Sequence, residues 1–346
     1  MQVRAVLFSW FVAAAVVLGA AQVALAQVDW TWQAMVVPPG PPGSWDSSRH
    51  QLGDVVFDGT TYHMFLVGGQ TPLSWDSPWS VGHWTWNALT QDWDEDTAHN
   101  PVLSPEPGQW DGYTIYNIAV LYDGAMFKMW YGAAASYPGA IYVGYATSLD
   151  GRLWIKDPAN PLPSLAPGVP GEWDDGGWHP GTVLFGDAIY RMWSFAVKNE
   201  GGAHGTWRIG YATSPDGIVW TKHPQAVLAG SEPWEGNLLY FPEVVPMGGG
   251  YAMWYSGFVS STSVASIGYA VSPDGLHWGK WPGNPVLSPL PGCNAVDSFA
   301  AMLDGNTVHA WTTNCYDIYY VTSPLEVVFF DAFETGDCAI WSSVVP

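Results

Sequence analysis

Short apolar stretches separated by turn residues run along most of the chain. Residues 55–57, then Asp58-Gly59, then residues 62–65 predict a strand, a tight turn and a second strand, because Asp and Gly tolerate the positive φ of such turns. In a later copy, residues 209–212 predict a third strand, and Trp220 opens a fourth after Ser-Pro-Asp-Gly. Helical periodicity is absent. The pattern therefore predicts an all-β chain of four-stranded antiparallel units.

These units recur. A Trp followed by Asp or Glu returns at spacings of 65, 63 and 61 residues, and a Met stands 19 residues after each Trp. The Trp residues are Trp45, Trp110, Trp173 and Trp234, and the Met residues are Met64, Met129, Met192 and Met253. Gly-Tyr-Ala-Thr/Val-Ser-x-Asp-Gly, followed by Trp, fills residues 144–154, 210–220 and 268–278. With a weaker fifth copy, repeats start near residues 45, 110, 173, 234 and 291, which predicts a five-bladed β-propeller.

The fifth repeat lacks the Asp-Gly…Trp segment, and the N-terminal region supplies a similar one. Residues 29–37 resemble residues 219–227 of the third repeat. We therefore expect residues 28–37 to form the outer strand of blade 5, which would close the propeller and cover an exposed strand edge.

Residues outside the repeats have the marks of export. Residues 1–26 combine Arg4, an apolar run and an Ala-Leu-Ala cleavage pattern, which predicts a signal peptide; a membrane anchor is the alternative. The propeller is expected over residues 27–328, and residues 329–346 form a tail that resembles those of exported bacterial proteins or is a frayed terminus. In an oxidising compartment Cys293 and Cys315 are expected to pair, leaving Cys338.

The charge balance limits the partners. Ten Lys and Arg stand against 31 Asp and Glu, which argues against nucleic acid and anionic membranes. The 23 Trp and 17 Tyr serve core packing or stacking on sugar rings. No later stretch is long enough to span a bilayer. We expect a secreted, periplasmic or extracellular monomer that binds carbohydrate.

The Met-Trp-Tyr strand together with the Gly-Tyr-Ala-Thr-Ser-x-Asp-Gly hairpin resembles the five-bladed propeller superfamily of arabinanases, invertases and levansucrases, and the related β-mannoside phosphorylases. The resemblance covers roughly residues 28–328 and rests on scaffold motifs. The hairpin also resembles the Asp-box of the six-bladed sialidases, but is one residue shorter. The resemblance implies a carbohydrate-active protein.

The innermost strand of each blade is expected to begin about nine residues after the blade's Trp. The aligned positions are Asp54, Ala119, Thr182, Glu243 and Ala300. Enzymes of the superfamily use an Asp of the first blade as base or nucleophile and a later Glu as general acid, so the resemblance implies these roles for Asp54 and Glu243. The chain departs from that pattern, since Glu243 lies in the fourth repeat rather than the third, and blade 2 carries Ala119.

The segments before the innermost strands differ between repeats and hold aromatic and polar residues that suit a sugar. The expected substrate-binding residues are His50, Tyr116, Asn117, Trp178, His179, Tyr240 and Asp297. His50 and His179 have an alternative role in packing. The acids that follow each repeated Trp, at Asp46, Asp111, Asp174 and Glu235, are expected to stabilise turns.

No cofactor or metal site is expected. Calcium prefers oxygen ligands such as the channel carboxylates, but no ligand spacing indicates it. Two functions remain open: a glycoside hydrolase or phosphorylase using Asp54 and Glu243, and a non-catalytic propeller that binds glycan or protein at the cell surface. Few Lys and Arg are available for a phosphate site, which disfavours the phosphorylase.

Overall fold

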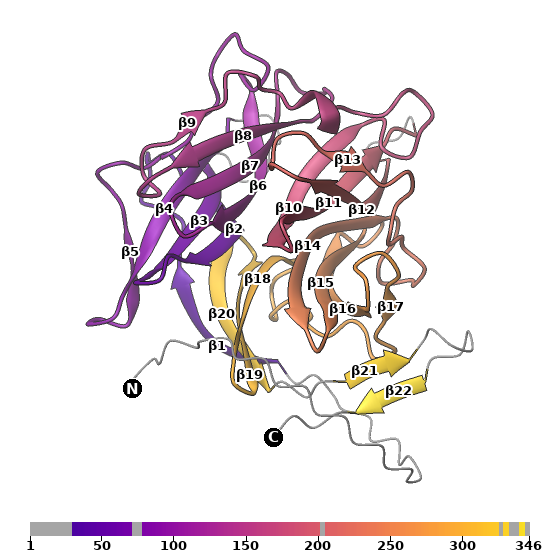
Figure 1. Ribbon diagram of the computed structural model, residues 1–346. Coiled ribbons are helices and arrows are strands. Elements are labelled where there is room, and N and C mark those ends of the chain that lie inside the picture. Colours follow the sequence, from indigo (N-terminus) through magenta and orange to yellow (C-terminus); the bar gives the residue numbers. More distant parts are fainter. Residues whose placement is uncertain (1–29, 71–77, 201–204, 325–327, 332–338, 343–346) are drawn as a thin grey trace.

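The computed structural model describes residues 30–70, 78–200, 205–324, 328–331 and 339–342 (Figure 1). The expected signal peptide and Cys338 lie outside these residues. Within them the chain is built of strands, apart from one short 3₁₀ turn, η1 (Pro163–Leu165), so the prediction of an all-β chain is confirmed. None of the described segments forms a helix with the length and apolar character needed to cross a membrane.

The strands group into antiparallel units of four, numbered here in chain order. Unit 1 contains β2 (Arg49–Phe57), β3 (Tyr62–Gly69), β4 (Ser80–Asn87) and β5 (Asp92–Glu95). Unit 2 contains β6 (Thr114–Tyr122), β7 (Phe127–Ala134), β8 (Tyr142–Ser148) and β9 (Ile155–Lys156). Unit 3 contains β10 (Gly177–Gly186), β11 (Ile189–Lys198), β12 (Thr206–Ser214) and β13 (Thr221–Lys222).

Unit 4 contains β14 (Leu238–Met247), β15 (Gly250–Val259), β16 (Val264–Ser272) and β17 (Gly279–Lys280). A single parallel pair, Trp207 with Leu238, joins units 3 and 4 into one eight-stranded sheet. Unit 5 contains β18 (Val296–Asp304), β19 (Thr307–Asn314), β20 (Asp317–Pro324) and β1 (Thr31–Val37). A separate two-stranded sheet is formed by β21 (Val328–Asp331) and β22 (Ala339–Ser342) in the C-terminal region.

The N-terminal strand completes the last unit. β1 runs antiparallel to β20, with Thr31 opposite Thr322 and Val37 opposite Ile318. Trp30, just before β1, packs edge-on against Phe299 at a ring-centroid distance of 5.1 Å. The expected pairing of the N-terminal segment with the fifth repeat is confirmed, and it joins the two ends of the repeat region.

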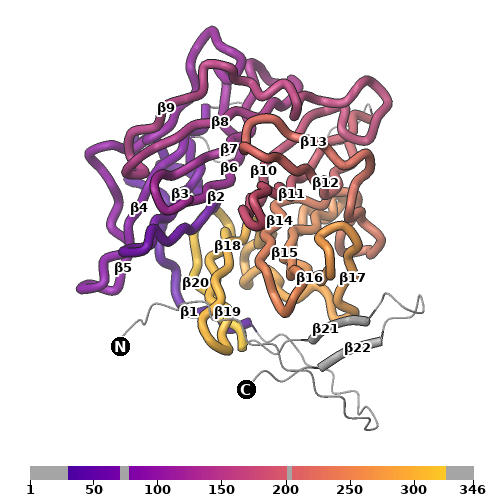
Figure 2. Tube along the Cα trace, viewed as in Figure 1, coloured from indigo at the N-terminus to yellow at the C-terminus, as the bar shows by residue number. Residues whose placement is uncertain are grey.

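The first strands of the units lie around a common centre (Figure 2). β2 contacts β6, β6 contacts β10, β10 contacts β14, β14 contacts β18, and β18 contacts β2 again. Each of the five apolar cores combines residues of two consecutive units, and one combines units 5 and 1. The Met residues of the repeat lie in these cores and are fully buried, which stabilises each by about 1.5–3 kcal/mol relative to exposure.

The repeated Trp and Gly residues form one packing motif. The indole of Trp173 lies over Gly210, and the indole of Trp234 lies over Gly268. A Cβ at Gly210 would lie 2.8 Å from Cη2 of Trp173, closer than carbon atoms pack. The Gly that opens each Gly-Tyr-Ala motif is therefore needed because a ring occupies the place of its side chain.

A second set of indoles links neighbouring units. Trp130 Nε1 donates to the Gly217 carbonyl at 2.7 Å, and Trp193 Nε1 donates to the Gly275 carbonyl at 2.8 Å. These carbonyls belong to the Asp-Gly turn of the following unit. Unit 5 has no such turn, and Trp254 Nε1 has no hydrogen-bond partner within the described residues.

Gly210→Ala is expected to lower the free energy of unfolding by about 1–3 kcal/mol, because the added methyl group overlaps the Trp173 ring. Gly186→Ala is the control, since the nearest atom to its added Cβ is Arg191 Nη1 at 3.9 Å. Chemical denaturation of both variants checks the prediction. Equal stabilities would contradict the packing role of Gly210.

Candidate functional site

The first strands begin earlier than the sequence indicated. Each starts four or five residues after the repeat boundary rather than about nine, as β2 does at Arg49. The reason is a β-bulge in every first strand, which interrupts the regular alternation; in β2 it lies between Leu52 and Asp54. Asp54 and Glu243 therefore lie within strands, and the expected binding residues lie in or beside the strand segments before the bulges.

Two levels of side chains follow from this alignment. The outer level, six residues after each repeat start, is called here the mouth ring. It consists of Gln51, Tyr116, His179, Tyr240 and Asp297. The inner level, three residues further, consists of Asp54, Ala119, Thr182, Glu243 and Ala300. Four expected binding residues thus share one level, and both expected catalytic residues share the other.

Asp54 bridges units 1 and 2. Its Oδ2 accepts a hydrogen bond from the Val120 backbone N–H at 2.8 Å, and its Oδ1 accepts one from the Val55 N–H at 2.8 Å. Val120 belongs to β6 and follows the aligned residue of unit 2. One carboxylate thus satisfies two backbone donors beside the bulge.

Glu243 makes the corresponding contacts between three units. Its Oε1 accepts from the Ala301 N–H in β18 at 3.0 Å, and its Oε2 accepts from the Thr182 hydroxyl in β10 at 2.8 Å. Thr182 in turn accepts from the Val244 N–H at 2.9 Å. Each of the three polar side chains at this level, Asp54, Thr182 and Glu243, therefore accepts a hydrogen bond from a backbone N–H group of the next unit.

Asp54 and Glu243 also act on each other. Burial raises the pKa of both carboxyl groups, and the negative charge of Asp54 raises the pKa of Glu243 further. Hydrogen bonds from Val120, Val55, Ala301 and Thr182 oppose these shifts. The two residues come from units 1 and 4, which unit 5 separates, so the repulsion acts across the centre of the ring. Such repulsion favours a state in which one of the two carboxyl groups is protonated and the other is ionised.

The mouth ring itself carries one acid, Asp297, whose ionised form is favoured by the positive charge of Arg49. Burial raises the pKa of Asp297 to about 6, while the positive charge of Arg49 lowers it. The Tyr240 hydroxyl lies 3.5 Å from Asp297 Oδ2. The Arg49 guanidinium stacks over Trp79 and Tyr316, 4.2 and 4.9 Å from their ring centroids. Arg49 thus supplies a positive charge that acts on Asp297.

His179 is held as a neutral acceptor. Burial lowers its pKa to about 3, and its ring stacks on Phe195 at a centroid distance of 4.2 Å. Its Nδ1 lies 2.9 Å from Asn117 Oδ1, and an amide oxygen can only accept, so Nδ1 carries the proton. Asn117 donates through Nδ2 to the Pro180 carbonyl. The remaining nitrogen, Nε2, is left to accept a hydrogen bond.

His50 and Trp178 lie elsewhere than expected. His50 Nε2 pairs with Asp46 at 2.8 Å, and Trp178 Nε1 donates to Asp174 at 2.6 Å, with both side chains fully buried. Successive side chains of a strand point to opposite faces. These two residues therefore point into the blade core while their neighbours Gln51 and His179 stand in the mouth ring.

The acids that follow the repeated Trp residues have structural partners. Asp111 pairs with Lys156 at 2.6 Å, and Glu235 pairs with Lys280 at 2.6 Å. Each lysine lies on the outer strand of the same unit. In unit 5, which has no acid at this position, the Cys293–Cys315 disulfide ties the segment before β18 to β19–β20. The expected pairing of these two cysteines is confirmed.

Three residues were missed or undervalued from the sequence: Arg49, Gln51 and Thr182. The alternation of side chains between the two faces of a strand could have identified them. Along β2 this alternation places Arg49 and Gln51 on the face opposite to His50. The bulges hid this alternation, because only the structure shows where each one occurs.

Among the described residues, no group of three or more His, Cys, Asp or Glu side chains could hold a metal ion. The carboxylates of the inner level are instead engaged by backbone N–H groups and a hydroxyl. Neither the absence of a cofactor nor the calcium alternative is tested by these contacts.

No family model matches the chain. Uncharacterized proteins from two strains of Mycobacterium tuberculosis are 32% identical over 176 residues, which is 46% of this chain and 54% of each relative. The vacuolar acid β-fructofuranosidase 4 of Arabidopsis thaliana is 27% identical over 154 residues, 40% of this chain and 18% of that protein. The chain spans about half the length of the mycobacterial proteins it matches.

Solved structures share the fold. A glycoside hydrolase matches with a TM-score of 0.68 at 18% identity, covering 85% of this chain and 92% of its own. A GH130 structure, described with glycoside hydrolases that target β-1,2 mannosidic linkages in Candida mannan, matches with a TM-score of 0.66 at 13% identity, covering 86% and 94%. A thermostable family-43 glycoside hydrolase matches with a TM-score of 0.57 at 19% identity, covering 86% and 96%. The resemblance to this superfamily is confirmed at the level of the fold.

Glu243→Gln is expected to gain stability relative to the native chain as pH rises from 5 to 9, by roughly 1–3 kcal/mol. A carboxyl group whose pKa is raised on folding binds its proton more tightly in the folded state, so native stability falls as pH rises through the raised pKa. Glutamine has no such proton, and it can still accept from the Ala301 N–H.

Denaturation at several pH values checks this expectation. Asp216→Asn is the control, because hydrogen bonds lower the pKa of Asp216 and its contribution is constant above pH 5. A difference between Glu243→Gln and the native chain that does not change with pH would contradict the raised pKa of Glu243.

Proposed function

We propose that the five units are the blades of one five-bladed propeller, formed by residues 27–328 after removal of an export signal at residues 1–26. The closed order of contacts among the first strands and the pairing of β1 with β20 support this arrangement. Residues 329–346 then lie outside it as a tail.

We further propose that the protein is an exported glycoside hydrolase acting on poly- or oligosaccharides at the mouth of the central channel. The observation that carries the proposal is the mutual repulsion of Asp54 and Glu243, both with raised pKa values, below a ring of hydrogen-bonding side chains. Hydrolysis of a glycosidic bond needs two carboxyl groups, one protonated and one ionised. A coupled pair provides that state near neutral pH.

Glu243 is the proposed general acid, because its pKa is raised by both burial and Asp54. It would donate its proton to the glycosidic oxygen as the bond to the anomeric carbon breaks. Asp54 would either remove a proton from the attacking water or attack the anomeric carbon itself. The reaction consumes one water and needs no cofactor.

The mouth ring would bind the sugar. Tyr116 and Tyr240 offer aromatic faces and hydroxyl groups, His179 Nε2 accepts, and Asp297 accepts through its carboxylate. Asn117 would act by fixing His179, with which it is hydrogen bonded. Alternating donors and acceptors of this kind suit the hydroxyl groups of a neutral sugar.

A non-catalytic glycan-binding propeller is the second candidate. The hydrogen bonds that Asp54 and Glu243 accept from backbone N–H groups of neighbouring units favour it, because a structural acceptor would make the same contacts. The mouth ring would serve this function equally well.

Hydrolysis of aryl glycosides with good and poor leaving groups tests the assignment, alongside a panel of polysaccharides. Glu243→Gln is expected to lower kcat by about 10²–10⁴-fold on substrates with poor leaving groups, and far less on dinitrophenyl glycosides, whose leaving group needs no proton. Asp54→Asn is expected to lose activity on both.

Thr313→Val is the matched control for structural damage. It removes the 2.9 Å acceptor of the Leu52 N–H between units 5 and 1 and the 2.7 Å contact with the Ser298 hydroxyl, and neither Asp54 nor Glu243 takes part in these bonds. It is expected to lose stability and keep activity. Full activity of Glu243→Gln would remove the proposed acid, and glycan binding without hydrolysis of any substrate would favour the second candidate.

A further inference from the structure

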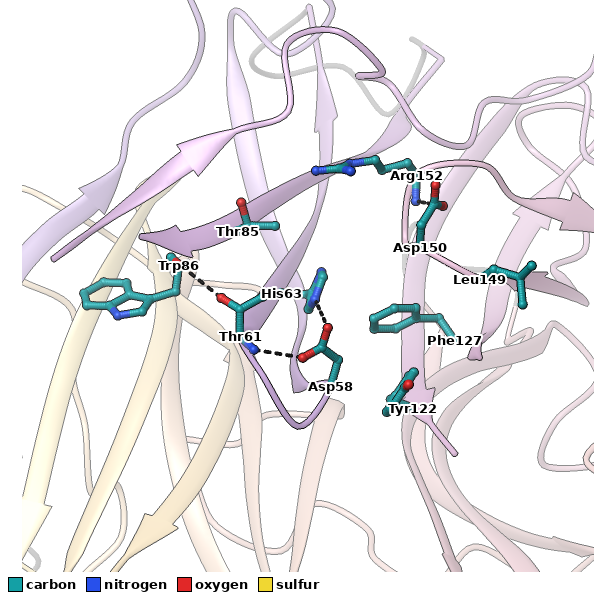
Figure 3. A pocket seen from close by; sticks show the side chains of 10 residues that line it. All are labelled: Asp58, Thr61, His63, Thr85, Trp86, Tyr122, Phe127, Leu149, Asp150 and Arg152. Atoms are coloured by element: carbon teal, nitrogen blue, oxygen red, sulfur yellow. Dashed lines mark hydrogen bonds and ion pairs between the residues drawn. The ribbon is translucent and has the colours of Figure 1, made fainter. Parts of the chain in front are cut away.

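A cavity lies between units 1 and 2. It has a volume of about 360 Å³. Its lining residues are Asp58, Thr61, His63, Thr85, Trp86, Tyr122, Phe127, Leu149, Asp150 and Arg152 (Figure 3). Asp58 follows the end of β2, whereas Gln51 of the mouth ring stands near its start. The two lie seven positions apart along the chain, which is about 20 Å at roughly 3.3 Å per residue.

Several side chains in and around the cavity differ from those at the equivalent positions of the other units. His63 pairs with Thr85, and this register aligns the next residue, Trp86, with the Ser of Ser-x-Asp-Gly in the next three units. His83 stands where those units carry Tyr145, Tyr211 and Tyr269. Arg152 stands where the equivalent turns carry Ile218 and Leu276. The scaffold therefore does not require these three side chains.

A series of polar contacts runs along one side of the cavity, from Asp58 through two histidines to Arg152. His63 Nδ1 lies 2.8 Å from His83 Nε2, and His63 Nε2 lies 3.1 Å from Asp58 Oδ2. His83 Nδ1 lies 3.5 Å from Asp96 Oδ2, which also accepts from Arg152 Nε at 2.7 Å. Burial lowers the pKa of His63, and lowers that of His83 to about 4, so both rings are neutral at pH 7.

A few polar atoms remain available to a ligand. Asp150 uses Oδ1 to hold its own turn, accepting from the Arg152 and Leu153 N–H groups. Its Oδ2, the Thr85 hydroxyl and the terminal nitrogens of Arg152 make no hydrogen bond within the described part of the chain. Figure 3 shows Thr85 on one side of the opening and Asp150 and Arg152 on the other, with the Arg152 side chain extending toward Thr85 and with Phe127 and Tyr122 below Asp150.

We propose that this cavity, called here the rear site, binds one unit of a neutral glycan independently of the channel. Aromatic rings of Trp86, Tyr122 and Phe127 supply apolar faces, and Arg152, Asp150 and Thr85 supply donors and acceptors for hydroxyl groups. An anion is disfavoured because two carboxylates line the site beside a single cation. Among the described residues, no three His, Cys, Asp or Glu side chains are grouped so that they could hold a metal ion there.

The test uses methyl glycosides of mannose, glucose, galactose, arabinose and fructose as probes with the full chain. Binding is followed by the indole Nε1–H resonance of Trp86 in 15N–1H spectra, assigned by comparison with Trp86→Phe. At least one glycoside is expected to shift this resonance. The shift is expected to persist in Glu243→Gln, so failure of the channel assignment and failure of the rear site are distinguishable.

Arg152→Leu and Asp150→Asn are expected to weaken this binding at least tenfold. Leucine already occupies the position of Arg152 in unit 4, so the turn accepts it. Asp216→Asn is the matched control for Asp150→Asn, because Asp216 holds the equivalent turn of unit 3 through the Ile218 and Val219 N–H groups. Its binding is expected to equal that of the native chain.

Three results would overturn the proposal. The first is the absence of a Trp86 shift with every glycoside. The second is a shift that survives unchanged in both Arg152→Leu and Asp150→Asn. The third is displacement of the glycoside by inorganic phosphate or by tetramethylammonium at equal concentration, which would identify an anion site or a cation site instead.

Discussion

The packing of one four-stranded unit against the next is the interaction on which the rest of this structure depends. A single unit has two apolar faces and cannot bury both alone, and every one of the five cores combines residues of two units. The Trp130–Gly217 hydrogen bond is a local contact of the same packing, whereas Trp173 over Gly210 fixes the interior of unit 3 itself. The pairing of β1 with β20 extends it to the chain ends, because unit 5 would otherwise expose an unfinished edge.

This packing explains why the central carboxylates have two sets of contacts. The first strands lie at the inner edge of their units, so some of their backbone N–H groups have no partner within the sheet, and Asp54, Thr182 and Glu243 accept from three of them across unit boundaries. Burial makes these hydrogen bonds necessary, because buried N–H groups need acceptors, and burial also raises the pKa of Asp54 and Glu243. Structural and chemical roles therefore rest on the same atoms, which is why stability and activity must be measured on the same variants.

Departure from the repeat is informative in two places. Asp54 and Glu243 are acidic where other units have Ala or Thr, and the rear site gathers Trp86, His83 and Arg152 where other units have Ser, Tyr or an aliphatic residue. Positions that the scaffold repeats have scaffold partners, as Asp111 has in Lys156 and Asp174 has in Lys222. A side chain that the scaffold does not need is the better candidate for binding or chemistry.

The sequence by itself determined the all-β class, the recurring four-stranded unit, the pairing of the N-terminal strand with the fifth repeat and the Cys293–Cys315 bridge, because turn residues and spacing are local and repeat. It also placed Asp54 and Glu243 at one aligned level. Only the tertiary structure decided that His50 and Trp178 point into the core, that the charge of Arg49 acts on Asp297, and that units 1 and 2 enclose the rear site. One physical reason is that a bulge changes the face of the strand on which the following side chains lie. The other is that contacts between units join residues that are far apart in the chain.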